Sequence, residues 1–170
     1  MPGSTPRWSR SEHRAELLRL YREVDELVEG WSCACSRAGV GGSPEAQCCH
    51  FAVTGREPYP TTVELEEVRH AAQAAPAVRR DPKLLPLVEL RACPLLSSEG
   101  RCRIYASRPF GCRTFFCDHA EGPSGPGQKL PRAAIAAVGR RIADLSGRFA
   151  PRDPGPRSLV KALAGRGKPL

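Results

Sequence analysis

The sequence contains no hydrophobic run long enough to span a membrane, and its first residues hold no apolar segment of the kind found in secretion signals. We therefore predict a cytoplasmic protein with no membrane partner. Disulfides are rare in that reducing compartment. The eight cysteines of the chain are accordingly predicted to be metal ligands or redox groups rather than structural bridges.

Two common site motifs are also absent. The glycine-rich loop at residues 36–44 follows no predicted strand and precedes no Gly-Lys-Ser or Gly-Lys-Thr, which disfavours a phosphate-binding loop. No two cysteines have the Cys-x2-Cys spacing of zinc knuckles, whose tight turns direct two thiolates at one ion. This second absence disfavours an ordinary zinc ribbon or finger.

The cysteines that are present form two groups of four. Each group supplies the number of thiolates that a tetrahedral zinc ion or an iron–sulfur cluster takes. We predict all eight as metal ligands: Cys33, Cys35, Cys48 and Cys49 in the first group, and Cys93, Cys102, Cys112 and Cys117 in the second. The glycines of the loop within the first group let the backbone wrap closely, as convergence of the flanking thiols requires.

The spacing of the cysteines favours an iron–sulfur cluster over zinc as the cofactor. The intervening counts are 1, 12, 0, 43, 8, 9 and 4 residues, and a cluster bound at separate corners tolerates such irregularity. The adjacent Cys48 and Cys49 complicate both interpretations, because neighbouring side chains point apart in extended backbone. One of them is therefore a candidate core thiol. His50 and His119 are alternative ligands that we do not favour, since a histidine near a metal site more often lies outside the coordination shell.

Three longer helices and one short helix are predicted from caps and periodicity. Ser9-Arg10-Ser11-Glu12 has the form of a capping box, and apolar residues follow it at helical spacing. A second capping box opens a helix over residues 62–75, and Pro131 opens a third. A short helix is expected over residues 158–164.

A β-hairpin is predicted at the centre of the second cysteine group. Residues 93–96 and 101–105 flank a turn at residues 97–100, whose glycine suits a left-handed position. In that geometry Cys93 and Cys102 lie nearly level on adjacent strands. The predicted fold class is thus mainly α with a small β-hairpin and irregular loops around a cysteine-rich metal site, a small α+β protein.

The chain length fits one structural domain. We divide it into a disordered start and N-terminal helix (1–30), a cysteine-cluster metal-binding core (31–121) and a basic C-terminal helix and tail (122–170). The whole net charge of +8 belongs to residues 129–170, which hold ten Lys and Arg against two acids. Nucleic acid or an acidic protein is therefore an alternative partner, which we do not favour because no aromatic stacking residues are interleaved with these arginines.

One long stretch resembles the Cys-x-Ile-Tyr-x-x-Arg-Pro-x-x-Cys-Arg signature of the YkgJ-type cysteine-cluster family of zinc- or iron-chelating domains: Cys102-Arg103-Ile104-Tyr105-Ala106-Ser107-Arg108-Pro109-Phe110-Gly111-Cys112-Arg113, preceded by Cys93-Pro94-Leu95-Leu96. The resemblance covers about residues 31–118. It departs from the family in the first group, where Cys33-x-Cys35 and a twelve-residue loop replace the commoner Cys-x2-Cys-x2-Cys-Cys. The resemblance implies a bound metal or cluster.

Three functions are compatible with these features. The preferred one is a metal-binding cysteine-cluster protein that holds an iron–sulfur cluster or zinc. The second is a cluster-dependent redox or modifying enzyme, in which Tyr105, Arg108 and Arg113 surround the cofactor and line a pocket for an anionic substrate. A simpler interpretation makes Tyr105 a core residue and pairs the arginines with Glu99 or Asp118. The third is a binding module that presents the basic C-terminal helix.

The enzyme alternative comes from the family resemblance alone. Distant members are described as flagellin lysine methylases, which implies a modifying activity for the family. The sequence contains no glycine-rich strand-to-helix turn for an adenosyl cofactor, so methyl transfer is not predicted here. No catalytic residue and no protein partner is predicted.

Overall fold

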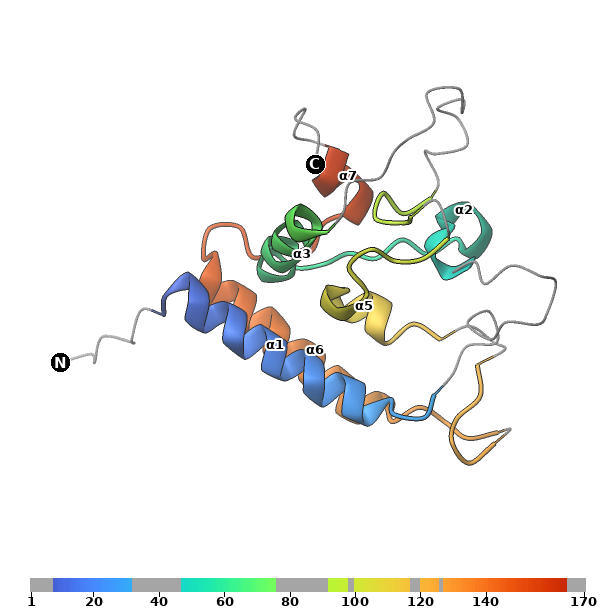
Figure 1. The fold of residues 1–170 in the computed structure, drawn as a ribbon. Helices are drawn as coiled ribbons and strands as arrows, with labels where there is room; N and C mark the ends of the chain where they lie inside the picture. Colours follow the sequence, from blue (N-terminus) through green and yellow to red (C-terminus); the bar gives the residue numbers. More distant parts are fainter. Residues whose placement is uncertain are drawn as a thin grey trace, which may run out of the picture.

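The computed structural model describes residues 8–31, 47–75, 92–97, 100–116, 120–125 and 127–164. Within these ranges the chain is mainly helical, which confirms the α-rich part of the predicted class. Its elements are α1 (Arg10–Leu27), η2 (Gln47–Cys49), α2 (Phe51–Thr54), α3 (Thr62–Ala74), η3 (Tyr105–Ser107), α5 (Phe110–Arg113), α6 (Arg132–Phe149) and α7 (Leu159–Ala164) (Figure 1).

Helix α1 begins at the predicted capping box. Ser9 Oγ accepts a hydrogen bond from the Glu12 backbone N–H at 3.2 Å, and Glu12 Oε2 accepts one from the Ser9 N–H at 2.6 Å. After the helix the chain passes through Gly30, which has a φ of +76°. A Cβ atom at Gly30 would lie 2.9 Å from Pro123 Cβ, so both the conformation and the close contact require glycine.

Helices α3 and α6 also begin where the sequence predicts. The backbone N–H of Thr61 donates to Glu64 Oε2 at 2.9 Å, which completes the second capping box. Helix α3 ends as Ala75 adopts extended backbone, with φ −78° and ψ 147°. This is the conformation that the proline at position 76 favours for the residue before it. Pro131 precedes α6 directly.

The first of two hydrophobic cores lies between the long helices. Helices α1 and α6 run side by side, and α3 crosses above them (Figure 1). Their apolar faces meet in a cluster of fully buried side chains: Leu17, Leu20, Tyr21, Val24, Val63, Val138, Ile142 and Leu145. Gly139 lets α6 approach α5 closely, because a Cβ atom there would lie 3.0 Å from Phe110 Cζ. This packing anchors α5, the helix that carries Cys112.

The second core lies on the other side of α3 and includes three cysteines. Leu65, Val68 and Ala72 of α3 pack with Leu95, Ile104 and Leu159, and the cluster also contains Cys49, Cys93 and Cys102. Helix α3 thus contributes to both cores. The second core draws together residues that are far apart in the sequence and places their thiols at its edge.

The predicted β-hairpin is wrong, because no strand forms within the described residues. Leu96 and Cys102 make only an isolated antiparallel bridge. Each arm turns immediately beside it: Leu96 N–H donates to Cys93 O at 3.0 Å, and η3 begins after Ile104, whose ψ is 36°. Cys93 therefore does not lie level with Cys102. The turn glycine was predicted correctly, since Gly100 has a φ of +72°.

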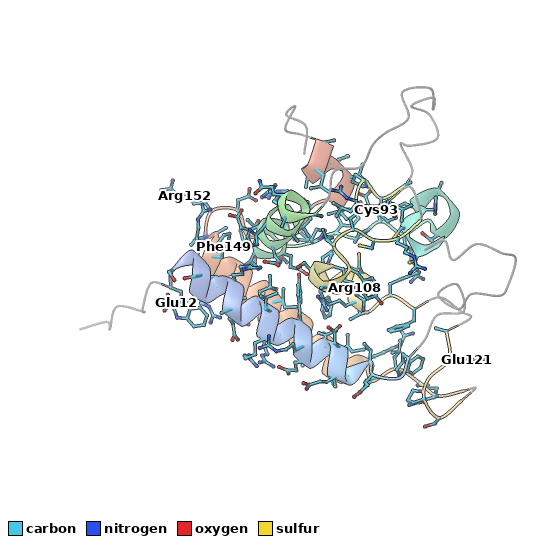
Figure 2. The ribbon with its side chains drawn as sticks, viewed as in Figure 1. Glu12, Cys93, Arg108, Glu121, Phe149 and Arg152 are labelled. Carbon is cyan, nitrogen blue, oxygen red and sulfur yellow. The ribbon has the colours of Figure 1, made fainter. Side chains whose placement is uncertain are left out.

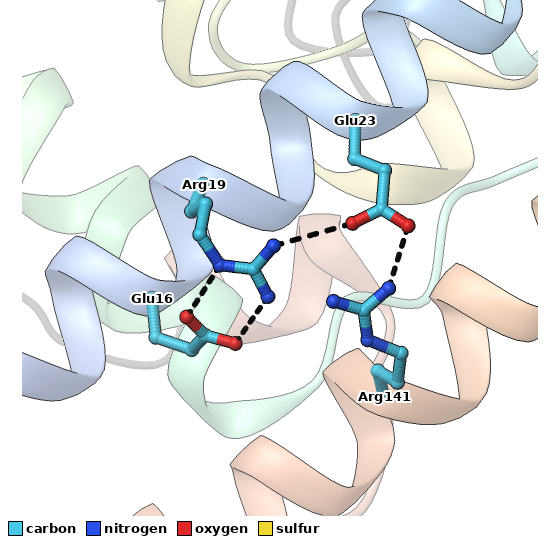
Figure 3. Close-up of polar contacts among 4 residues, drawn as sticks. All are labelled: Glu16, Arg19, Glu23 and Arg141. Carbon is cyan, nitrogen blue, oxygen red and sulfur yellow. Dashed lines mark hydrogen bonds and ion pairs between the residues drawn. The ribbon is translucent and has the colours of Figure 1, made fainter.

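The basic C-terminal region folds back on the acidic face of α1. Arg141 Nη1 lies 2.5 Å from Glu23 Oε1, and Glu23 also contacts Arg19, which pairs with Glu16 at 2.6 Å (Figure 3). Part of the local positive charge is therefore matched by acids that lie far away in the sequence. Among the described residues, no helix is both long enough and apolar enough to cross a membrane.

Candidate metal centre

Five of the eight predicted ligands are described, and all five are free thiols: Cys48, Cys49, Cys93, Cys102 and Cys112. Cys33, Cys35 and Cys117, with the alternative ligand His119, lie outside the described residues. The five thiols come from four separate segments, namely η2, the turn before Leu95, the bridge at Cys102 and helix α5. Cys93 is buried and the other four are half-buried.

Backbone hydrogen bonds bring the two cysteine groups together. The Cys93 N–H donates to Cys49 O at 2.7 Å, and the neighbouring His50 and Ala92 form an antiparallel bridge. Arg103 N–H donates to Leu95 O at 2.9 Å, which fixes the segment of Cys102 beside that of Cys93. Backbone hydrogen bonds thus hold the segments of the two groups side by side.

The adjacent Cys48 and Cys49 lie side by side instead of pointing apart. They belong to the 3-10 turn η2, not to extended backbone, and their thiols are hydrogen bonded to each other. Cys49 is also hydrogen bonded to the Cys93 thiol. Cys49 packs against the second core, as expected for one thiol of the pair, and both side chains are half-buried.

The thiols raise one another's pKa values. The hydrogen bond with Cys49, followed by burial, raises the pKa of Cys48 well above its ordinary value. For Cys49, the hydrogen bond from Cys48 lowers the pKa, but the Cys93 hydrogen bond and burial outweigh it and raise the pKa to about 12. Burial and the nearby Cys49, Cys102 and Cys48 raise the pKa of Cys112 to about 12. Cys48, Cys49 and Cys112 therefore hold their protons more tightly than an ordinary thiol does, because each of their pKa values is raised.

The chemistry of these donors fits a thiophilic metal. Bound cations deprotonate coordinating thiols outright, and soft thiolates are the ligands that zinc and iron–sulfur clusters prefer. In the described part of the chain, no three Cys, His, Asp or Glu side chains are arranged to hold an ion as they stand. Metal binding would therefore involve loss of the thiol protons, and Cys33, Cys35 and Cys117 are the further candidate ligands.

The structure separates the roles of the three residues predicted around the cofactor. Tyr105 is 64% exposed, so its interpretation as a core residue was wrong. Arg113 is buried and bonds to Asp25, while Glu99 and Asp118, the acids considered from the sequence, lie outside the described residues. Arg108 stacks on the Tyr105 ring at 4.1 Å, and its charge lowers the pKa of Cys102 against the larger effect of burial. In Figure 2, Arg108 and Cys93 both lie on the side of the molecule that carries α2 and α5.

Two buried carboxylates of α3 hold the loop between Cys102 and Cys112, and the sequence did not single them out for this role. Glu64 Oε1 accepts from the Phe110 N–H at 2.7 Å, at the start of α5. Glu67 Oε1 accepts from Ser107 Oγ at 2.8 Å. Both side chains are at most 3% exposed. The sequence signal that could have identified them is the position of these two acids within the apolar stripe of a predicted helix.

Two surface hollows lie away from the thiols. One follows the outer face of α1 beside Trp8 and Arg19, and the other lies between α1 and α3 beside Arg14 and Val63. Neither is lined by a described cysteine. They therefore provide no substrate pocket next to the candidate metal centre.

Free thiols that converge from separate segments on a helical scaffold define a candidate thiolate metal-binding protein. Residues 45–125, just under half of the chain, match the family model CxxCxxCC, described as a "putative zinc- or iron-chelating domain". This match confirms the predicted resemblance to a metal-chelating cysteine-cluster family over these residues. They contain six of the predicted ligands, whereas Cys33 and Cys35 precede them. No curated protein and no solved structure matches the chain.

Proposed function

We propose that this protein binds a metal through thiolates contributed by both cysteine groups, with an iron–sulfur cluster as the first candidate and zinc as the second. The observation that carries the proposal is the convergence of five free thiols from four segments. Either metal takes four protein thiolates. Cys117 lies within the matched family region and, with Cys33 and Cys35, completes the proposed set of eight.

The preference for a cluster is supported by how the ligands are supplied. A zinc site of the knuckle type takes two thiolates from one tight turn, and the sequence has no such turn. Here the described thiols come as one adjacent pair and three single residues on separate segments. A cluster has its ligand positions at separate corners, so it accommodates thiolates from separate segments more readily than a single ion does.

Metal analysis of the protein purified without oxygen tests the proposal. We expect brown protein that contains iron and acid-labile sulfide in equal amounts. Colourless protein with stoichiometric zinc would contradict the cluster and retain the thiolate site. Protein that is fully folded, fully reduced and free of both metals, and that takes up neither on reconstitution, would contradict metal binding itself.

Serine substitutions test which thiols bind the metal. Cys102→Ser and Cys112→Ser should each reduce metal content, because each removes a thiolate that a serine hydroxyl does not replace. Ala133→Ser is the matched control, since it adds a hydroxyl to the exposed face of α6. Wild-type metal content in both cysteine variants would refute this ligand set. The metal content of Cys33→Ser tests whether a cysteine that precedes the matched family region is also a ligand.

No specific contact among the described residues favours the two alternative functions. A cluster-dependent enzyme needs a substrate pocket beside the thiols, and the hollows described above lie elsewhere. A nucleic-acid module needs exposed, unmatched basic residues, whereas Arg141 and Arg157 already pair with Glu23 and Asp153. Metal binding is therefore the function that the arrangement of the residues supports best.

A further inference from the structure

The guanidinium of Arg108 has no hydrogen-bond acceptor in the part of the chain that the structure describes. Its Nε atom is buried and has no partner. Its Nη2 atom lies 3.9 Å from Asp25 Oδ1, which is beyond hydrogen-bond distance. The group stacks on the Tyr105 ring at 4.1 Å, and this contact uses none of its N–H donors. Buried polar groups are nearly always paired, so the buried Nε–H lacks the acceptor that it requires, while the side chain as a whole is 21% exposed.

Arg113, five residues further on, shows what a fully paired arginine looks like in the same loop. Its side chain is 3% exposed, and its three nitrogens donate to Arg108 O, Asp25 and Ala106 O. Arg113 therefore stabilises the loop, and each of its three nitrogens has an acceptor. It also fixes the backbone of Arg108, so the position of the Arg108 side chain is not an accident of a loose loop.

The thiols are the nearby groups that can become acceptors. Hydrogen bonding with Cys49 raises the pKa of Cys48, and burial raises the pKa values of Cys102 and Cys112, while the Arg108 charge lowers all three. The cation thus lies within electrostatic reach of thiols from three segments. Four thiolates around Zn²⁺, or around a cluster core of charge +2, carry a net charge of −2. A single guanidinium offsets half of that charge.

We propose that Arg108 donates hydrogen bonds to the thiolate sulfurs of the metal-loaded site and balances part of their negative charge. This inference rests on the proposed metal-binding function. Tyr105 is then the platform that holds the guanidinium plane, and Arg113 fixes the backbone beneath it. Arg108 is a positioning residue that acts on the ligands, since the metal itself is bound by the thiolates.

Titration of the reduced, metal-free, full-length protein with Co²⁺ under argon tests the proposal. Thiolate-to-cobalt absorption reports both the affinity and the electron density on sulfur. Arg108→Gln should weaken Co²⁺ binding about ten- to a hundred-fold, the usual effect of removing a partner of metal ligands. It should also shift the absorption to lower energy, because the sulfurs lose hydrogen bonds. Arg108→Lys should recover part of the affinity, since it keeps the charge but not the planar fork.

Arg140→Gln makes the same chemical change on the exposed face of α6 and should leave both readouts unchanged. Wild-type affinity and an unshifted band in Arg108→Gln would overturn the role of Arg108 and leave metal binding intact. If that variant fails to fold, an unshifted band in Arg108→Lys overturns the role instead. Arg108→Gln could instead bind Co²⁺ as tightly as the wild type but no longer be stabilised against unfolding by inorganic phosphate. That result would identify an exogenous anion as the acceptor for Arg108 and contradict the proposal. A wild-type protein without any thiolate-to-cobalt band would refute the proposed function together with this inference.

Discussion

Replacing Arg113 by methionine should destabilise the protein far more than the same replacement of Arg141. Both arginines lie 2.5 Å from a carboxylate oxygen, but the Arg113 side chain is 3% exposed and that of Arg141 is 43% exposed. Methionine leaves the Arg108 and Ala106 carbonyls without the donors that Arg113 supplies. Breaking a buried pair costs roughly 3–5 kcal/mol, whereas exposed pairs contribute about 0–1 kcal/mol.

The exposure of Asp25 sets the expected magnitude. Its side chain is 46% exposed, so water partly replaces the lost partner, and we expect the lower end of the range, about 3 kcal/mol, for Arg113→Met. At about 2–4 °C per kcal/mol for a chain of this size, the melting temperature falls by roughly 6–12 °C. Urea unfolding of the reduced, metal-free variants measures the loss of free energy, and thermal unfolding measures the melting temperature. Equal losses for the two variants would refute the argument that burial decides the contribution.

Three further predictions concern other parts of the fold. Glu57→Ala should cost roughly 1–3 kcal/mol and speed hydrogen exchange in α7, because Glu57 Oε1 accepts the Val160 N–H at 2.9 Å. Gly139→Val should cost about 1–3 kcal/mol in urea unfolding, since its side chain meets the Phe110 ring; an unchanged midpoint would contradict this packing. The metal-free protein should lose stability as the pH rises from about 9 to 12. Folding raises the pKa of Cys112 from 9.0 to about 12, so the folded state holds this proton more tightly than the unfolded state does. Unfolding of Cys112→Ser across the same pH range should show a smaller loss of stability.

The long helices were predictable because their signals are local. Ser9 with Glu12, and Thr61 with Glu64, are capping boxes that need only four consecutive residues to recognise. The hairpin failed for a related reason. Its two arms lack a sustained alternation of apolar and polar residues, and the segments turn at once into η3 and the Cys93 turn.

The site was predictable only as a list of thiols. Cysteine chemistry predicted the ligands that we propose, but the proximity of their segments depends on contacts between distant parts of the chain, such as Cys49 with Cys93. Asp25 and Arg113 are 88 residues apart, and no local pattern joins them. The side-chain directions of Cys48 and Cys49 were not predictable, since they depend on the 3-10 conformation of η2, which the sequence did not reveal.

The two cores explain how segments far apart in the sequence bring their thiols together. The first core contains no cysteine, so the apolar contacts among α1, α3 and α6, which ion pairs such as Arg141 with Glu23 supplement, need no thiol. Helix α3 connects the two cores, since its Leu65 and Val68 pack in the second one. Its Glu64 and Glu67 accept hydrogen bonds from the loop that leads to Cys112. A bound metal would therefore act on thiols whose segments the fold already holds together, and its binding free energy would include that of deprotonating them.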